Sequence, residues 1–325
     1  MIIDIHAHLL PQGTLDALAA RPGQFPSVSL LRDANELRLA FAGGSPTRPI
    51  MPALRHFGPR QRFLAGAGID LQLAGGWLDA FGYELPAEEG ADWSRFLNEG
   101  MLAECRDRDG VLPLATVPLQ SGALAARVLR EAVRDGMPGA MIGTQNRGSS
   151  GSLDDPDLDP FWETAAELGV PVIVHPMFGS ADARLHDMQM MNAVGRVSDV
   201  STAVSRLLFK GHLSRFAGLV LVASTGGGAL PYMLGRLERN HRAFPGLVVD
   251  PVEQFALLYF DSVVFQPRIL RFLVEMAGVE RIMLGSDYPF PIGDPDPRAV
   301  IEQAGLEASA TEAMLTGTTR RLFGV

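Results

Sequence analysis

Residues 2–9 read IIDIHAHL, a short apolar run that ends on two histidines, and seven comparable runs follow it along the chain. Short runs of this kind, separated by longer segments with apolar residues at three- and four-residue steps, predict alternating strands and helices. The predicted strands are Ile2–Ile5, Ile69–Ala74, Leu112–Val117, Gly139–Ile142, Val170–Val174, Leu219–Ala223, Leu258–Val264 and Arg281–Leu284.

The segments between these runs favour parallel β–α units. Helices are predicted over Ala123–Arg134, Phe161–Leu168, Tyr232–Arg242 and Ile269–Ala277, with a final helix over Thr311–Phe323. Runs such as VPVIV and GLVLVA are apolar without alternation, which is typical of strands covered on both faces. Eight β–α units favour an α/β fold of the closed (β/α)8 TIM-barrel type. An open doubly wound sheet has the same alternation and stays the alternative.

The connection after the first predicted strand is the longest in the chain and is rich in Gly, Pro and Arg. Connections of this length are usually functional. We predict that Pro11–Pro59 forms a lid or small insertion over the mouth of the barrel, with short strands of its own. Residues 1–325 otherwise form a single barrel domain.

Composition restricts the class of partner. The net charge is −9 and 20% of residues are charged, so a nucleic acid or an anionic membrane surface would be repelled overall. No apolar run approaches the roughly 18 residues needed to cross a bilayer. The N-terminus lacks the basic and apolar regions of a secretory signal, so a cytoplasmic location is expected. The single cysteine, Cys105, is expected to be a buried helical residue without a catalytic role.

Four residues at predicted strand ends suggest a metal site. His6 and His8 are two apart on a strand, so their side chains share a face. His175 directly follows VPVIV, and Asp287 directly follows RIMLGS. In barrel enzymes the catalytic groups lie at the carboxyl ends of the strands. Three imidazoles and one carboxylate suit zinc or a similar divalent ion, with room for water or a substrate.

With these residues identified, the chain resembles the amidohydrolase superfamily, and within it the aminocarboxymuconate-semialdehyde decarboxylase group. The resemblance spans nearly the whole chain in the family's order. The matching stretches are MIIDIHAHLLP, the run from Arg48 through GPRQRFLAGAGIDLQL, MIGTQ, VPVIVHP, GGGALPYMLGR and MLGSDYPFPIG.

The resemblance implies a distorted (β/α)8 barrel, one divalent ion (zinc, with manganese as the alternative), and frequently a homodimer. His6, His8, His175 and Asp287 match the family's metal ligands. The implied activity is nonoxidative decarboxylation of a small carboxylate, often derived from an aromatic compound. Metal-dependent hydrolysis of a C–C or C–N bond at the same site is the alternative.

Other matched positions suggest contacts with the substrate. Arg48 matches a family arginine that pairs with a substrate carboxylate; a solvated loop arginine is the other interpretation. Arg236 matches a second family arginine near the mouth, where the alternative is a surface ion-pair partner. Gly226 and Gly227 could let backbone N–H groups approach an anion at the start of the following helix, or could simply form a tight turn.

One position departs from the family. The family places a histidine before the triple glycine, where it activates water at the metal, but this chain has Thr225 there. A threonine hydroxyl is no general base near neutral pH. Asp287 is the best remaining acid–base group, and His186, in the loop after the fifth strand, could reach the mouth. A third interpretation is a barrel that binds metal and ligand but turns over poorly.

Overall fold

The computed structural model of the chain describes residues 1–33, 36–148, 151–177 and 182–325. Parallel strands form two sheets, one of β1, β4 and β5 and the other of β6 through β10. Backbone bridges join the sheets on both sides, at Ala115 with Ala140 and at Ala7 with Tyr288. The strands are β1 (Ile3–Leu9), β4 (Leu71–Gly76), β5 (Val111–Pro113), β6 (Ala140–Gly143), β7 (Val172–His175), β8 (Leu221–Ala223), β9 (Tyr259–Asp261) and β10 (Ile282–Met283).

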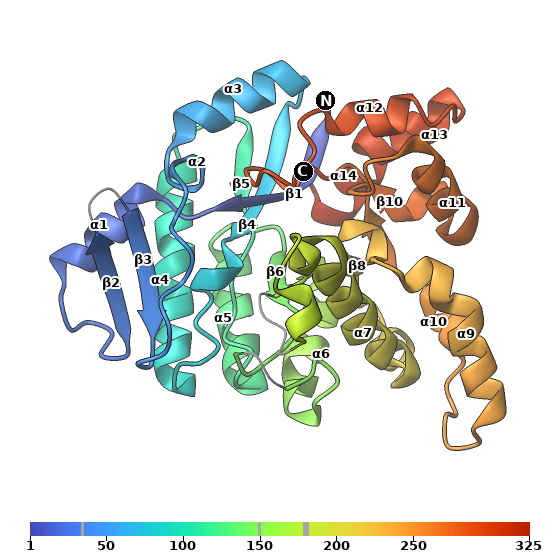
Figure 1. The fold of residues 1–325 in the computed structure, drawn as a ribbon, viewed down its shortest axis with the longest axis horizontal. Helices are drawn as coiled ribbons and strands as arrows, with labels where there is room; N and C mark the ends of the chain where they lie inside the picture. The colour runs from blue at the N-terminus through green and yellow to red at the C-terminus, as the bar shows by residue number, and fades with distance from the viewer. Residues whose placement is uncertain (34–35, 149–150, 178–181) are drawn as a thin grey trace.

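This closed arrangement confirms the predicted (β/α)8 barrel. Figure 1 shows helices packed around the strands, as expected where a parallel sheet is covered on its outer face. The helices are α1 (Gln12–Ala20), α2 (Pro52–Arg55), α3 (Phe57–Ala67), α4 (Ala87–Cys105), α5 (Gly122–Arg134), α6 (Asp159–Leu168), α7 (Arg196–Phe209), α8 (His212–Arg215), α9 (Leu230–Ala243), α10 (Pro251–Phe255), α11 (Pro267–Ala277), α12 (Pro297–Glu302), α13 (Ala308–Glu312) and α14 (Thr318–Phe323).

The long first connection contains α1, α2 and an antiparallel hairpin of β2 (Val28–Asp33) and β3 (Glu36–Phe41). It has a separate apolar core that packs on α4, where the Phe25 ring lies 5.1 Å from Trp93 and 5.2 Å from Phe96. Figure 1 shows the hairpin beside α4, at the left edge of the molecule. A role of this insertion as a lid remains a prediction.

Strand positions agree with the sequence pattern, but several strand ends differ. β1 continues to Leu9 and β5 ends at Pro113, where the sequence predicted ends at Ile5 and Val117. The predicted strand Leu258–Val264 is shorter in the structure, where β9 ends at Asp261. The chain turns there because the N–H groups of Val263 and Gly226 donate to the Asp261 carboxylate. The predicted helix Thr311–Phe323 comprises the end of α13, a wider turn over Ala313–Gly317, and α14.

The barrel core is mostly apolar, with a smaller set of buried polar side chains within it. Phe161 and Trp162 on α6 are fully buried against it, and Cys105 is buried at the end of α4, as predicted. Among the described residues no helix combines the length and apolar character needed to span a bilayer. Because all barrel strands are parallel, their carboxyl ends meet at one face, which is where the functional side chains gather.

Candidate metal centre

The structure brings the four predicted metal ligands together. His6 and His8 lie on β1, His175 is the last residue of β7, and Asp287 follows β10. All four are buried, and one ligand atom from each lies within 4.8 Å of the others. Two strand neighbours on one face and two residues from strand ends thus converge at the carboxyl end of the barrel.

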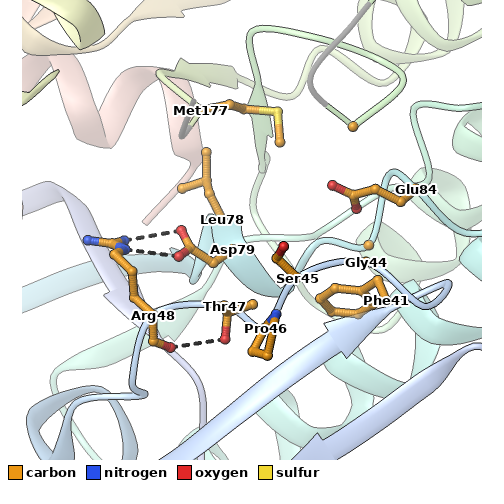
Figure 2. A pocket seen from close by; sticks show the side chains of 12 residues that line it. Phe41, Gly44, Ser45, Pro46, Thr47, Arg48, Leu78, Asp79, Glu84 and Met177 are labelled. Atoms are coloured by element: carbon orange, nitrogen blue, oxygen red, sulfur yellow. Dashed lines mark hydrogen bonds and ion pairs between the residues drawn. The ribbon is translucent and has the colours of Figure 1, made fainter. Parts of the chain in front are cut away.

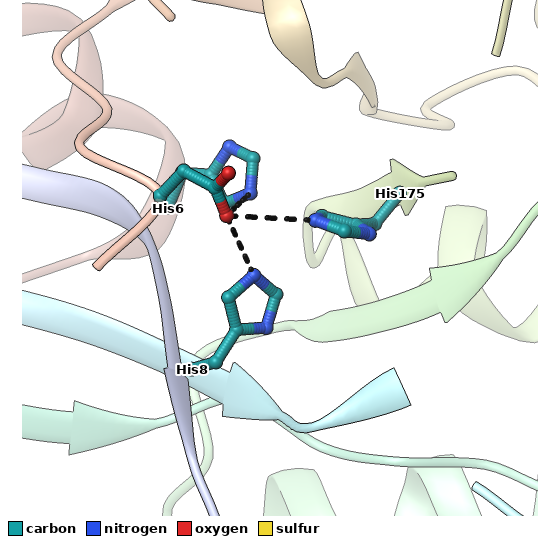
Figure 3. Close-up of side chains that lie close together, drawn as sticks. His6, His8 and His175 are labelled. Carbon is teal, nitrogen blue, oxygen red and sulfur yellow. Dashed lines mark hydrogen bonds and ion pairs between the residues drawn. The ribbon is translucent and has the colours of Figure 1, made fainter. Parts of the chain in front are cut away.

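The spacing of the four groups fits a single ion. Figure 3 shows three imidazoles around one carboxylate oxygen: Asp287 Oδ1 lies 3.2 Å from His8 Nε2, 3.5 Å from His6 Nε2 and 3.9 Å from His175 Nε2. Tetrahedral ligands at about 2.0–2.1 Å from a zinc ion are about 3.3 Å apart. His6 Nε2 is buried and has no hydrogen-bond partner among the described residues. This is expected of a nitrogen whose lone pair binds a cation.

Each imidazole is oriented by a bond from its other nitrogen. Nδ1 of His6 bonds the Asp261 carboxylate (2.5 Å), that of His8 the Gly76 carbonyl (3.1 Å), and that of His175 the Pro176 carbonyl (2.9 Å). Carbonyl and carboxylate oxygens only accept, so each Nδ1 is the donor. The lone pair of each Nε2 is therefore left for the common centre, which is the usual arrangement of metal-binding histidines.

Asp261 was not anticipated from the sequence, although it joins two parts of the site. Its Oδ2 accepts from His6 and from the Thr225 N–H at 2.9 Å, while its Oδ1 accepts from the Gly226 N–H at 2.7 Å. The predicted strand ran through Val264 and so placed Asp261 in the strand interior. The usable signal was a carboxylate at the end of the apolar run LLYF, a position equivalent to that of Asp287.

The last strand can pass close to this pair only because of a glycine. A Cβ added at Gly285 would lie 3.0 Å from the Asp261 Cβ and 3.1 Å from the His6 Cβ. Contacts this short would force the neighbouring backbone to move. Gly285 therefore lets the segment that carries Asp287 approach β1.

The buried charges shift the pKa values of the ligands in different directions. Burial alone lowers the pKa of His6, but the Asp261 bond and the nearby carboxylates outweigh it and raise this pKa to about 9. Burial, with the charges of His8 and His6, lowers the pKa of His175 to about 3. The neighbouring imidazoles of His175, His8 and His6 outweigh burial and lower the pKa of Asp287. A cation entering at neutral pH would therefore displace a proton from His6.

A cavity of about 390 Å³ lies between the insertion and the segment after β4. None of the four ligands lines it, but Met177, two residues after His175, does. Figure 2 shows Arg48 and Asp79 at one end of the cavity, joined by two bonds of 3.0 and 3.1 Å. The Arg48 guanidinium also lies 5.8 Å from the Phe290 ring, and that ring lies 5.0 Å from the His8 ring. Arg48 therefore lies at the cavity and one aromatic ring away from the metal ligands.

A second arginine, which sequence reasoning missed, faces the same region. Arg196 begins α7 and is buried, and burial together with the Arg48 charge lowers its pKa to about 10. The charges of Asp287 and Asp79 act on it in the opposite direction. No motif in the sequence marks Arg196, because it follows β7 by a long loop and shares no periodicity with the ligands.

The backbone N–H groups in the turn after β8 donate hydrogen bonds to other groups of the protein. Thr225 lies at positive φ (53°), and its hydroxyl donates to the Ser224 carbonyl at 2.7 Å. The N–H of Gly226 donates to Asp261, and that of Gly227 to the Ser224 carbonyl at 3.0 Å. These bonds match the tight-turn interpretation of Gly226 and Gly227 rather than an anion contact through their amides.

The remaining predicted residues lie farther out. His186 is exposed in the turn after a short helix over Ala183–Leu185, and Arg236 is exposed on α9. Within the described residues, neither belongs to the four-ligand group or to the lining of the cavity. Catalytic involvement of His186 and substrate contact by Arg236 therefore remain predictions without support from this geometry.

Comparisons with known proteins agree with the fold. The profile of the amidohydrolase family matches residues 3–325. Among curated proteins, the chain is similar to a 2-amino-3-carboxymuconate-6-semialdehyde decarboxylase from Dictyostelium discoideum. The two are 28% identical over 322 residues, which cover 97% of this chain and 89% of the relative.

Solved structures with the same architecture include 5-carboxyvanillate decarboxylase from Sphingomonas paucimobilis, with a TM-score of 0.81 and 25% identity, covering 100% of this chain and 99% of the other. A dihydroxybenzoic acid decarboxylase from Polaromonas, solved with bound manganese and an inhibitor, aligns with a TM-score of 0.80 and 20% identity. It covers 99% of this chain and 96% of its own, and at this identity it supports the fold alone.

Replacing Asp261 with Asn should weaken metal binding about 10- to 100-fold, the usual cost of removing the group that orients a metal-binding histidine. The amide keeps the size of the side chain but removes the charge that fixes the His6 tautomer. Titration of the apo-protein with Zn²⁺ or Mn²⁺ measures the change, with exposed Asp107→Asn as the matched control. Equal affinities in the two variants would contradict this role of Asp261.

Proposed function

The chain belongs to the amidohydrolase family, and from this membership we propose that it is a metal-dependent nonoxidative decarboxylase of a small carboxylate, often aromatic-derived. The observation that carries the proposal is the convergence of three imidazoles and one carboxylate, with Arg48 of a nearby cavity one aromatic ring away from His8. The whole-chain similarity to a decarboxylase supports the same activity.

We assign the four buried ligands to one divalent cation. Zinc is the first candidate, since three nitrogens and one carboxylate oxygen suit it, and manganese is the alternative. When bound, such an ion withdraws electrons from a coordinated substrate oxygen and so stabilises negative charge that develops during bond cleavage.

Arg48 and Arg196 are proposed to hold the substrate carboxylate. A guanidinium presents paired donors that match the two oxygens of a carboxylate. Burial first, and then the charge of Arg48, lowers the Arg196 pKa, so part of this shift is repulsion between the two guanidinium groups. An anion between them would relieve this repulsion. The ion pair with Asp79 would then hold the Arg48 guanidinium in place at the edge of the cavity.

Decarboxylation requires one proton and no oxidant. The bond between the carboxyl carbon and its neighbour breaks, CO2 leaves, and the neighbouring carbon takes a proton in place of the carboxyl group. Asp287 is the proposed carrier of that proton, because it is the carboxylate at the centre. Its lowered pKa keeps it ionised at rest, so it must take the proton from water and pass it directly to the carbon. Thr225 contributes only hydrogen bonding in this scheme.

Hydrolysis of a C–C or C–N bond at the same site is the second candidate function, because the choice of substrate depends on the loops rather than on the ligands. Thr225 bears on a third candidate. A site without the family's usual histidine has lost one way of moving protons, and a weakly active metal-binding barrel would have the same sequence. The homodimer and the cytoplasmic location expected from the sequence also remain predictions.

Incubation of the metal-loaded protein with benzoate-type and muconate-type carboxylates should release CO2, with one product per CO2. Removal of the metal with a chelator should abolish the release, and added Zn²⁺ or Mn²⁺ should restore it. Product analysis by mass spectrometry distinguishes loss of 44 mass units from addition of water. Hydrolysis without CO2, or CO2 release unaffected by metal removal, would contradict the proposal.

Replacing Arg196 with Met should raise KM for the carboxylate substrate by about tenfold or more, because a hydrogen bond to a charged group is worth about 1.5–3 kcal/mol. Steady-state kinetics and the metal content of the variant provide the measurement. Arg239→Met, on the exposed face of α9, is the matched control. An unchanged KM in the Arg196 variant would show that substrate binding does not use this guanidinium.

Replacing Thr225 with His should increase the rate, since it restores a titratable base beside the centre. Histidine also tolerates the positive φ of this position better than a β-branched residue. Thr225→Asn is the matched control, because Asn accepts the same backbone conformation but is no base. A faster Asn variant would attribute the gain to the backbone, and a slower His variant would show that Thr225 serves a different chemistry.

A further inference from the structure

A second polar cluster lies within the barrel wall, next to the metal ligands but separate from them. Its members are fully buried and come from four elements: β1, α3, β4 and the segment after β10. They are Asp4, Arg60, Gln72 and Ser286. None of them belongs to the four-ligand group.

Asp4 is the acceptor at the middle of this cluster. Its Oδ2 accepts from Gln72 Nε2 at 2.7 Å and from Ser286 Oγ at 2.5 Å. Its Oδ1 accepts from the backbone N–H groups of His6 and Ser286, both at 3.0 Å. The carboxylate therefore ties the backbone of one histidine ligand to the residue that precedes Asp287.

Arg60 is the cation of the cluster and reaches the other histidine ligand. One terminal nitrogen donates to Gln72 Oε1, and the other donates to the backbone carbonyl of His8. The guanidinium also lies 4.8 Å from the ring centre of Tyr288, the residue after Asp287. Gln72 thus stands between the two charges, accepting from Arg60 and donating to Asp4.

The bonds of this network end on the backbone of the ligand segments. They fix the His6 amide, the His8 carbonyl and the amides on both sides of Asp287, since Tyr288 N–H donates to Ser286 Oγ at 3.1 Å. A ligand's side chain can be no better placed than the backbone that carries it. The network is therefore positioned to set the relative places of three of the four ligands.

We propose that Arg60 is a positioning residue whose bonds, through Gln72 and Asp4, set the metal affinity of the centre. Stability alone does not account for it, because buried ion pairs can often be replaced by apolar residues with no loss of stability. The cluster of four buried polar side chains bonds the backbone of the segments that carry the ligands, and this bonding has a purpose if it holds the ligands at the distances that a cation needs. This inference rests on the proposed metal-dependent function, but it concerns binding of the ion rather than turnover.

The test removes both buried charges together. In Arg60→Met/Asp4→Asn, the amide introduced at position 4 can still accept from the His6 N–H, and Gln72 can turn its oxygen toward that amide. The His8 carbonyl loses its donor, while no uncompensated charge is left inside. We expect a folded protein whose melting temperature is somewhat below that of the parent, because the buried His8 carbonyl has lost its donor. It should bind Mn²⁺ or Zn²⁺ at least tenfold more weakly in calorimetric titration of the apo-protein.

Arg60→Lys covers the case in which the double variant does not fold. Lysine keeps the charge, but its three N–H groups all leave from one nitrogen. It therefore cannot reach Gln72 and the His8 carbonyl together as the two terminal nitrogens of the guanidinium do. We expect a loss of metal affinity of about threefold or more with the fold retained. Arg62→Met is the matched control, because Arg62 is exposed two residues further along α3. Its affinity should equal that of the parent.

The outcomes separate this inference from the proposed function. Parent-like metal affinity in a folded Arg60 variant overturns the positioning role, whatever the enzyme does with carboxylates. A parent that binds the ion but releases no CO2 overturns the decarboxylase proposal and leaves the positioning role intact. A variant that loses melting temperature but no metal affinity assigns Arg60 to stability alone.

Discussion

The hydrogen bonds between β1 and the segment after β10 connect the first strand of the barrel to the last. The N–H of Asp287 donates to the His6 carbonyl at 2.7 Å, and the N–H of His8 donates to the Tyr288 carbonyl at 2.7 Å. These bonds close the barrel, and they also place a carboxylate from one end of the sequence beside two imidazoles from the other. Barrel closure in this chain therefore also brings the ligands of the centre together.

Burying four titratable groups at this junction is costly unless each has a defined partner. The structure provides one for every inward-facing ring: a carboxylate for His6 and backbone carbonyls for His8 and His175. The difference between these acceptors explains the opposite pKa shifts. Asp261 contributes a full negative charge and raises the pKa of His6, whereas a carbonyl dipole cannot offset the burial of His175.

The sequence predicted those site residues whose positions follow from regular spacing along the strands. A two-residue repeat on a strand places His6 and His8 on one face, and the strand-end rule locates His175 and Asp287. Asp261 was missed because the end of its strand was misplaced, and that end is set by bonds from the next loop rather than by apolar pattern. Arg60 and Arg196 could not be inferred, since their partners are a backbone carbonyl and charges remote in sequence. Contacts of this kind depend on the packed fold and leave no local pattern.

At position 225 the bonds to Asp261 that fix the backbone conformation do not involve the side chain. Thr225 and the three glycines after it all have positive φ, a conformation that costs a β-branched residue about 1–3 kcal/mol. The Asp261 carboxylate holds the turn by accepting from the amides of Thr225 and Gly226, and the same carboxylate orients His6. The shape of the turn is thus fixed by the metal ligand's own partner, independently of which side chain stands at position 225. The backbone conformation at position 225 and the chemistry of the side chain there are therefore determined separately.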